Sequence, residues 1–441
     1  MQPAGLKALR QLGMIKAISN IEAIHVDGYY ISYQGESLDI PYPDKSYLKR
    51  IDTTPVPGAI QRGDEDKLVS DSTLDIQEWD ASPTTKGVAF QHGEFLMNLR
   101  AICLAEKNVT KLEGNVTGLV KDEFGKVLGI KVANKGEYKA KITINCDGIF
   151  SKFRKELGDD YVTKVGSYFI GLDLVDAQMP SPNHGHVILG DHAPVLVYQI
   201  SPHHTRILCA YRSTKVPKRE EALKYLTNEV LPALPLSLQP SFKDALDVGG
   251  PEVYRAMANQ YLTARANTVP GLICVGDSLN MRHPLTGGGM TVGLNDAVLL
   301  TKMLSEIPDE DLGNEDIMLD KMLSFHSERK SLDVVLNTLS IALYALFAAD
   351  NQYLKILQRG CFAYFLRGGD CTSGPIGLLS GLVPDWFVLF KHFFAVAFYA
   401  CYLNFVDRGI LGFPVALYEN ISVLVTAAFV LFPYLLTELF S

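Results

Sequence analysis

Residues 274–290, CVGDSLNMRHPLTGGGM, place an acid, an Arg-His pair and three consecutive glycines directly after an apolar run. Glycines let a planar or phosphorylated ligand approach the main chain, and the helix expected to begin near Met290 points free N–H groups at it. Asp277 lies at the carboxyl end of the expected strand, where open α/β sheets bind ligands. Because a carboxylate repels phosphate, we expect Asp277 to accept hydrogen bonds from sugar-like hydroxyls. Arg282 and His283 are expected to shape the loop.

The structural alternatives for this stretch are a simple turn at Asp277 and a flexible linker at the three glycines. The acid and the glycines occur together between a strand and a helix, which argues against both alternatives. A second stretch, ITINCDGIFSKFRKEL at 142–157, has an apolar strand that ends in Asp147-Gly148 and leads into a basic helix. That layout suits a phosphate held near a helix N-terminus. An Asp-Gly pair after a strand is also a common turn, so this motif alone leaves both interpretations open.

The elements that must position these residues alternate along the chain. Apolar and polar periodicity, with Gly, Pro and Asn at the breaks, predicts the following elements. They are a β-hairpin or meander at 20–50, a helix at 93–107, short strands at 109–148, a strand-rich layer at 161–260, a strand–loop–helix unit at 269–306 and a long helical run from 320 to 350.

The chain becomes strongly apolar near its C-terminal end, at 386–406 and 415–440. Each stretch approaches the roughly 20 residues that cross a bilayer. The first carries Lys391 and His392, and the second carries Glu419. They are expected to span a membrane or to lie in one leaflet, and a buried helical pair in a soluble core is the alternative.

Composition excludes several classes of function. The chain has 441 residues and a net charge of −8, whereas affinity for nucleic acid requires clustered Lys and Arg. Its seven cysteines are scattered without a Cys-x-x-Cys pair. That pattern favours reduced thiols in a cytosol-facing protein and predicts no metal site.

Two motifs resemble those of a known family. GDSLNMRHPLTGGGMTVGLNDAVLL is similar to the second FAD motif of squalene epoxidases (squalene monooxygenases), and CDGIFSKFRKEL is similar to the Asp-Gly motif of related flavoprotein monooxygenases. Further stretches, from MQPAGLKALRQLGM through GYYISYQGESLDIPYP to HFFAVAFYA, resemble the family in the same order. The resemblance covers nearly the whole chain and is fungal in character.

The resemblance implies an α/β (α+β) flavoprotein monooxygenase fold. It comprises a Rossmann-like FAD-binding domain, an inserted β-sheet substrate domain and a C-terminal helical membrane anchor. The implied ranges are 1–160 for the FAD-binding domain with a β insertion, 161–265 for the substrate domain, 266–306 for the rest of the FAD-binding domain, 307–385 for a helical region and 386–441 for the membrane-associated helices.

Site residues follow from the resemblance, position by position. The residues that it implies for FAD are Arg100, Val116, Asp147, Gly148, Asp277, Gly287, Gly288, Gly289 and Met290. The residues that it implies for the substrate are Gln2, Tyr29 and His392. Each of the three has a structural alternative. Tyr29 could be an ordinary aromatic side chain of a strand, His392 an anchor at the membrane interface, and Gln2 part of a frayed terminus.

The implied activity is FAD-dependent epoxidation of squalene by O₂ to 2,3-oxidosqualene through a flavin C4a-hydroperoxide, in sterol (ergosterol) biosynthesis. Squalene has no acidic proton and no polar handle, so no catalytic acid or base is expected in the protein. Electrons would come from NADPH through NADPH-cytochrome P450 reductase. The implied location is the endoplasmic reticulum membrane (microsomal), in contact with membrane lipid and with the catalytic part facing the cytosol, with lipid droplets as a further site.

One departure concerns the Gly-x-Gly-x-x-Gly unit that opens the family and holds the ADP half of FAD. The chain starts at a point that normally follows this unit. The expectation is therefore a fragment, a mis-predicted start, or a shortened and catalytically silent membrane-bound paralogue. A flavoprotein hydroxylase of another apolar substrate is the remaining alternative.

Overall fold

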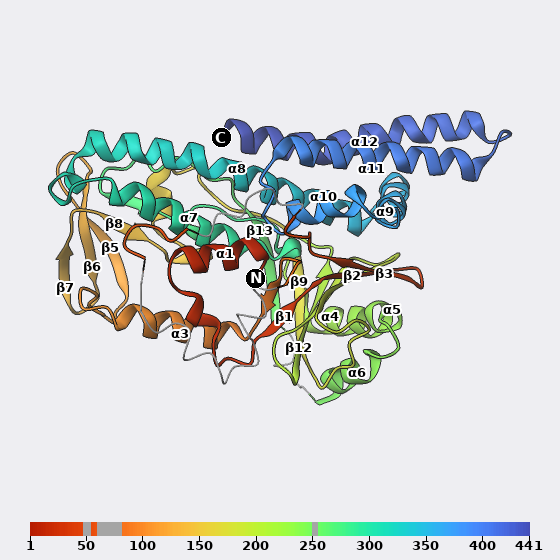
Figure 1. Ribbon diagram of the computed structural model, residues 1–441, viewed down its shortest axis with the longest axis horizontal. Coiled ribbons are helices and arrows are strands. Elements are labelled where there is room, and N and C mark those ends of the chain that lie inside the picture. Colours follow the sequence, from red (N-terminus) through yellow and green to blue (C-terminus); the bar gives the residue numbers. More distant parts are fainter. Residues whose placement is uncertain (47–53, 60–81, 249–254) are drawn as a thin grey trace.

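A computed structural model of the chain describes residues 1–46, 54–59, 82–248 and 255–441. Figure 1 shows a sheet-rich half, a second half built from small sheets and long helices, and a pair of long helices at the C-terminal end of the chain along one side. The strands are β1 Ile24–Val26, β2 Gly28–Tyr33, β3 Glu36–Pro41, β4 Gly87–Ala89, β5 Val116–Lys121, β6 Val127–Val132, β7 Gly136–Lys139, β8 Thr143–Asn145, β9 Lys164–Val175, β10 His184–Leu189, β11 Val195–Gln199, β12 His204–Tyr211, β13 Arg255–Tyr261 and β14 Leu272–Cys274. The helices are α1 Pro3–Gln11, α3 His92–Leu104, α4 Arg219–Tyr225, α5 Leu231–Ala233, α6 Gln239–Val248, α7 Gly289–Ser305, α8 Glu315–Ala348, α9 Gln352–Phe365, α10 Asp370–Leu379, α11 Trp386–Arg408 and α12 Phe413–Phe440.

The largest sheet has seven strands in the order β13-β9-β12-β11-β10-β2-β3. β2 and β3 form the predicted hairpin, whose turn Gln34-Gly35 has positive φ at both residues, as a tight hairpin turn requires. β2 also pairs in parallel with β10, far away in the sequence. The sheet therefore joins the hairpin, from the range 1–160 predicted for the FAD-binding domain, to strands within the predicted substrate range 161–265. Those domain boundaries stay a prediction.

Alternation of side chains along the strands gives this sheet two apolar faces. On β9, Phe169 packs toward α9 and α11, whereas its neighbour Ile170 packs toward α4 to α6. Phe242 of α6 is fully buried in the second cluster. Helices thus cover both faces of the sheet, which stabilises it by removing apolar area from water.

The other half of the molecule is built around a short parallel pair. β14 pairs with β8, and the antiparallel strands β5, β6 and β7 form a separate sheet beside it. α7 packs between α1 and α8 and leads away from the glycine-rich loop. Carboxyl ends of parallel strands meet at one edge, so the two strand-end motifs predicted to bind a ligand are brought together there.

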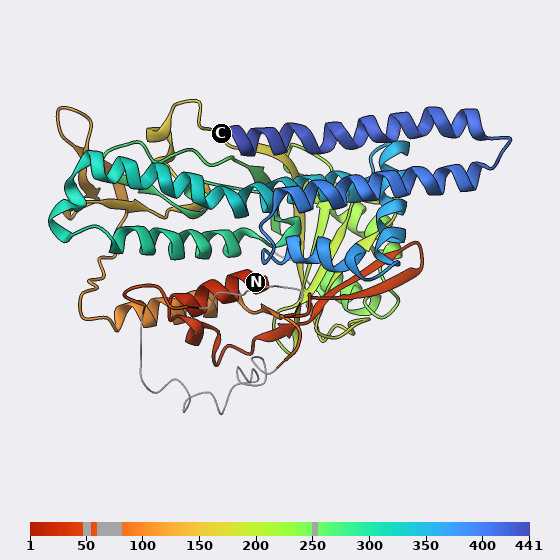
Figure 2. The same cartoon turned by 45° about the horizontal axis from the view of Figure 1, so that its top comes forward.

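Three described helices are long and apolar enough to cross a membrane, namely α8, α11 and α12. α8 is mostly buried inside the protein, so it belongs to the core. α11 and α12 are mostly exposed and form an antiparallel pair that projects beyond the rest of the molecule (Figures 1 and 2). This exposure argues against the alternative of a helical pair buried in a soluble core.

Candidate functional site

Two strand-end motifs lie side by side at the edge of the β8–β14 pair. Asn145 pairs with Cys274, and each strand then runs into a 3₁₀ turn that carries an exposed acid, Asp147 or Asp277. Arg154 Nη2 donates hydrogen bonds of 3.0 Å to the carbonyl oxygen atoms of both Gly148 and Asp277. One guanidinium therefore ties the two motifs into a single edge.

The main chain at this edge is open to a ligand. Gly148 has a φ of +73° and Gly276 has a φ of +62°, a left-handed conformation that glycine adopts without strain. No described heavy atom lies within 4 Å of the place where a β-carbon would project from either glycine. A planar or phosphorylated group can therefore approach the backbone here.

The glycine-rich loop offers a ligand a second set of unpaired polar groups. Gly287, with a φ of +62°, ends the 3₁₀ turn Pro284–Thr286, and α7 begins two residues later at Gly289. The helix start has no side-chain cap, so its first N–H groups can donate to a bound group. Thr286 Oγ1 is buried without a hydrogen-bond partner among the described residues. These unpaired groups would be satisfied by a polar ligand.

Arg282 holds the loop from behind. Its Nη1 lies 3.4 Å from the carbonyl oxygen atoms of Gly288 and of Gly289, and its Nε donates to Asn337 Oδ1 at 2.6 Å. Its Nη2 donates to the Asn280 side chain. The buried guanidinium therefore fixes the path of the glycines, which is the loop-shaping role expected for Arg282.

His283 shapes the other end of the loop. Its Nδ1 accepts a hydrogen bond from the Leu285 N–H at 3.2 Å, so the proton lies on Nε2, 3.1 Å from Ser167 Oγ. The ring stacks on Tyr344 at 4.0 Å between centroids. Burial lowers the pKa of His283 to about 3, so this side chain is neutral and structural.

A polar cluster joins the start of α1 to the hairpin and the loop. Gln2 Nε2 donates to the Tyr29 hydroxyl at 2.7 Å and to the Thr286 carbonyl at 2.8 Å, and the Tyr42 hydroxyl donates to Gln2 Oε1 at 2.6 Å. Burial raises the pKa of Tyr29 to about 12 and that of Tyr42 well above its usual range. Both phenols therefore stay neutral and orient the amide.

This cluster lines a cavity of about 200 Å³. Its wall is formed mainly by apolar side chains of the large sheet and by the glycine-rich loop, namely by Met1, Gln2, Val26, Tyr29, Tyr42, Val88, Ala89, Gly185, His186, Val187, Leu196, Val197, Tyr198, Leu208, Pro284, Leu285, Thr286, Gly287 and Met290. Two residues predicted for the substrate, Gln2 and Tyr29, thus face the same cavity as two predicted for FAD, Gly287 and Met290. Burial lowers the pKa of His186 to about 4, so it adds no charge near neutral pH.

Three predicted residues lie outside the cavity wall and also outside the strand-end motifs and the glycine-rich loop. Arg100 is exposed on α3, where its Nη1 contacts Met97 Sδ at 3.7 Å, and Val116 begins β5. His392 is buried on α11, and its Nδ1 lies 3.0 Å from the Tyr364 hydroxyl. The structure therefore does not bring these three to Gln2 and Tyr29, and their roles stay predictions.

Sequence reasoning missed Tyr42 and Asn337. The hairpin register pairs Gly28 with Pro41, which places Tyr42 beside the start of β2, so the register of the Gln34-Gly35 turn would have located it. Asn337 lies in the middle of α8 and gives no local signal, because its hydrogen bonds join segments far apart in the sequence.

Comparisons with known proteins identify the family and the fold of the chain. The family model described as "SE: Squalene epoxidase" matches residues 139–418. The chain is similar to "Squalene epoxidase ERG1" of Candida albicans, with 52% identity over 100% of this chain and 90% of that protein, and to "Squalene epoxidase ERG1" of Saccharomyces cerevisiae, with 52% identity over 100% and 87%. Its fold is similar to the crystal structure of pqsL, a probable FAD-dependent monooxygenase from Pseudomonas aeruginosa, with a TM-score of 0.57, 17% identity and coverage of 83% and 88%. The predicted flavoprotein monooxygenase fold is thereby confirmed.

Proposed function

The chain belongs to the squalene epoxidase family, and from this premise we propose that it is an FAD-dependent monooxygenase that converts squalene and O₂ to 2,3-oxidosqualene. The observation that carries the proposal is the shared cavity. Its wall joins the glycine-rich loop to an apolar pocket that holds only a small polar cluster. Such a pocket suits a substrate that is a hydrocarbon throughout.

The residues fit FAD. The main chain is open at Gly148 and Gly276, and Thr286 Oγ1 is a buried hydroxyl without a partner among the described residues. The groups proposed to hold the cofactor are Arg100, Val116, Asp147, Gly148, Asp277, Gly287, Gly288, Gly289 and Met290. When bound, FAD supplies the reducing electrons and the site at which O₂ is activated.

The chain's own residues position the substrate and exclude water. Squalene offers no proton and no hydrogen-bonding group, so the protein needs no acid or base that acts on it. We propose that Gln2 and Tyr29 border the end of the pocket that receives the alkene. Leu196, Leu208 and Leu285 exclude water from that alkene and from the loop. His392, which is buried on α11 outside this cavity, is proposed as a further substrate residue.

The remaining parts of the proposal concern electrons and location. We propose that NADPH supplies the electrons through a reductase, NADPH-cytochrome P450 reductase, and that the protein lies in the endoplasmic reticulum membrane, with lipid droplets as a second site. The exposed apolar helices α11 and α12 support a membrane location, because squalene itself partitions into lipid.

The test uses the full chain purified in detergent. We expect a flavin absorbance spectrum from the purified protein and formation of 2,3-oxidosqualene, detected by mass spectrometry, when squalene, NADPH and the reductase are added. The same reaction without squalene is the control, because it measures NADPH consumption that is not coupled to epoxidation. Absence of flavin after FAD is supplied would overturn the proposal. Oxygenation of a different hydrocarbon, with squalene untouched, would show a hydroxylase of another apolar substrate.

A further inference from the structure

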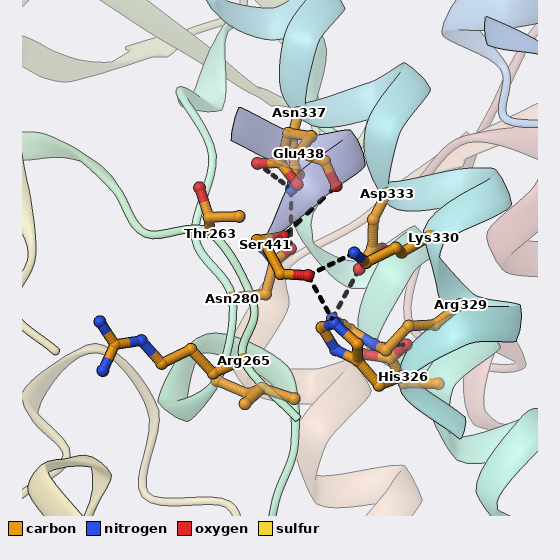
Figure 3. Close-up of polar contacts among 12 residues, drawn as sticks. Thr263, Arg265, Asn280, His326, Arg329, Lys330, Asp333, Asn337, Glu438 and Ser441 are labelled. Carbon is orange, nitrogen blue, oxygen red and sulfur yellow. Dashed lines mark hydrogen bonds and ion pairs between the residues drawn. The ribbon is translucent and has the colours of Figure 1, made fainter. Parts of the chain in front are cut away.

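The last turn of α12 carries a carboxylate that faces the body of the protein. Glu438 is only 2% exposed, although α12 is otherwise one of the most exposed apolar helices. Figure 3 shows Glu438 on this turn facing Asn337 of α8. A buried carboxylate requires hydrogen bonds or a nearby cation, so its partners identify what it does.

The partners of Glu438 come from two other elements. Its Oε1 accepts a hydrogen bond of 2.6 Å from the Tyr261 hydroxyl of β13 and one of 3.0 Å from Asn337 Nδ2 of α8. Thr263 Oγ1 in turn donates to the Tyr261 hydroxyl at 2.9 Å. The end of α12 is thus fixed to a strand and to a core helix by directional bonds.

Asn337 connects Glu438 to Arg282, which contacts the glycine-rich loop. Its Nδ2 donates to Glu438 and, at 3.3 Å, to Asn280 Oδ1, while its Oδ1 accepts from Arg282 Nε at 2.6 Å. One orientation of the amide therefore serves all three partners. Arg282 then reaches the carbonyl oxygen atoms of Gly288 and Gly289. A continuous chain of hydrogen bonds therefore runs from the apolar helix to the loop at the proposed cofactor site.

The charge of Arg282 fixes the direction of the hydrogen bonds that run from Arg282 through Asn337 to Glu438. Arg282 remains a cation when buried, and the ion pairs formed by the described residues do not include it. Burial lowers the pKa of its guanidinium, while the negative charge of Asp333 opposes that effect. The Asn337 side-chain oxygen faces this cation and its nitrogen faces the Glu438 oxygen, which favours the observed orientation of the amide.

We propose that Glu438 is a positioning residue for the glycine-rich loop, acting through Asn337 and Arg282, so that docking of α12 on the body is coupled to retention of FAD. This inference rests on the proposed function for the identity of the cofactor. The hydrogen bonds from Glu438 through Asn337 to Arg282, called the relay below, involve only side chains of this protein.

The test compares three variants of the full detergent-solubilised chain. Glu438→Leu removes the acceptor, Glu438→Gln keeps an oxygen in the same place, and Glu419→Leu is the matched control. Glu419 is also a buried acid on α12, but it pairs with Arg408 and Asn404 within the α11–α12 hairpin. The readouts are hydrogen–deuterium exchange of the peptide that contains residues 282–290 and the Kd for FAD, measured by quenching of flavin fluorescence.

We expect Glu438→Leu to speed exchange of this peptide in the flavin-free protein and to raise the Kd for FAD about tenfold, within the usual range of coupling between sites. Glu438→Gln should remain within about twofold of the unmodified chain, since it keeps the hydrogen bonds. Glu419→Leu should leave both readouts unchanged, because Glu419 bonds to α11 within the hairpin and not to Asn337.

Three results would overturn the inference. They are an unchanged exchange rate in Glu438→Leu, an equal effect of Glu419→Leu, or a Glu438→Gln variant as impaired as Glu438→Leu. The exchange measurement needs no cofactor, so it decides the inference even if the unmodified chain binds no FAD. Failure of the unmodified chain to bind FAD would count against the proposed function alone.

Discussion

The side-chain amide nitrogen of Gln2 lies 2.7 Å from the phenol oxygen of Tyr29 and donates a hydrogen bond to it. The first residue precedes α1, and the second lies on β2 of the large sheet. The same nitrogen donates to the Thr286 carbonyl, directly before the three glycines. Through these two hydrogen bonds the Gln2 amide ties the proposed substrate wall to the proposed cofactor loop.

Replacing Gln2 should impair turnover of squalene. Gln2→Ala leaves the two phenols and the Thr286 carbonyl without their shared partner, and each unsatisfied buried group costs about 1–3 kcal/mol. We expect kcat/KM for squalene to fall about tenfold or more. Gln199→Ala is the matched control, because Gln199 on β11 bonds only locally, to the Pro202 carbonyl, and does not line the cavity. Equal kcat/KM in the two variants would contradict the role given to Gln2.

Replacing Gly287 should destabilise the loop. An alanine at a φ of +62° is strained by about 1–2 kcal/mol, and its β-carbon would lie 3.6 Å from Gln2 Nε2. We expect Gly287→Ala to lower the Tm by a few degrees and to weaken FAD binding. Gly313→Ala provides the control, since Gly313 has ordinary φ and no described atom within 4 Å of the new carbon. A Tm for Gly287→Ala that equals that of Gly313→Ala would refute the prediction.

Stability should fall in mild acid because two histidines are buried in the neutral form. Their pKa values drop from 6.5 to about 4 for His186 and about 3 for His283. Between pH 6.5 and 4 the unfolded chain binds protons that the folded chain does not, so lowering the pH favours unfolding. Each histidine contributes about 1.4 kcal/mol per pH unit in this window at most.

Thermal unfolding in detergent between pH 7 and pH 4.5 measures this effect. We expect His283→Gln, although less stable at pH 7, to lose less of its Tm on acidification than the unmodified chain. His203→Gln is the control, because His203 is exposed and Asp176 raises its pKa, so its loss cannot remove the acid sensitivity. A Tm of the unmodified chain that stays constant down to pH 4.5 is the contrary outcome.

Placing a charge on the exposed face of α12 should prevent membrane association. Phe429 is 74% exposed in the middle of this helix. Burying an acid at such a position in a bilayer costs about 2.5–3.5 kcal/mol, so we expect Phe429→Glu to reduce co-flotation with phosphatidylcholine vesicles severely. Phe124→Glu is the matched control, since Phe124 is 88% exposed in the turn after β5. Equal flotation of both variants would exclude α12 as the membrane contact.

Local patterns predicted the elements that carry the site. The strand at 272–274, the glycine-rich loop and α7 were expected from apolar runs and glycines, and the structure has them in that order. The cysteines are all free thiols, as their spacing predicts. These features depend on short stretches of chain, where spacing and residue type are sufficient.

Long-range contacts could not be predicted in this way. The parallel pairing of β2 with β10 depends on the packing of the whole sheet, and nothing in either strand specifies it. Glu438 lies within an apolar stretch that was predicted as a membrane-associated helix, with a buried helical pair as the alternative, and neither prediction indicated its bond to Asn337 of α8. Buried polar contacts of this kind arise from the tertiary arrangement, so periodicity does not indicate them.

The relay from Glu438 to the glycine-rich loop also has a consequence for biosynthesis. During translation the loop leaves the ribosome well before α12 does, so Arg282 and Asn337 are in place while their carboxylate partner is still missing. The loop would then acquire its final geometry only after the apolar hairpin has been synthesised and has folded back on α8. Retention of the proposed cofactor would thereby depend on a chain that has been synthesised through to the last turn of α12.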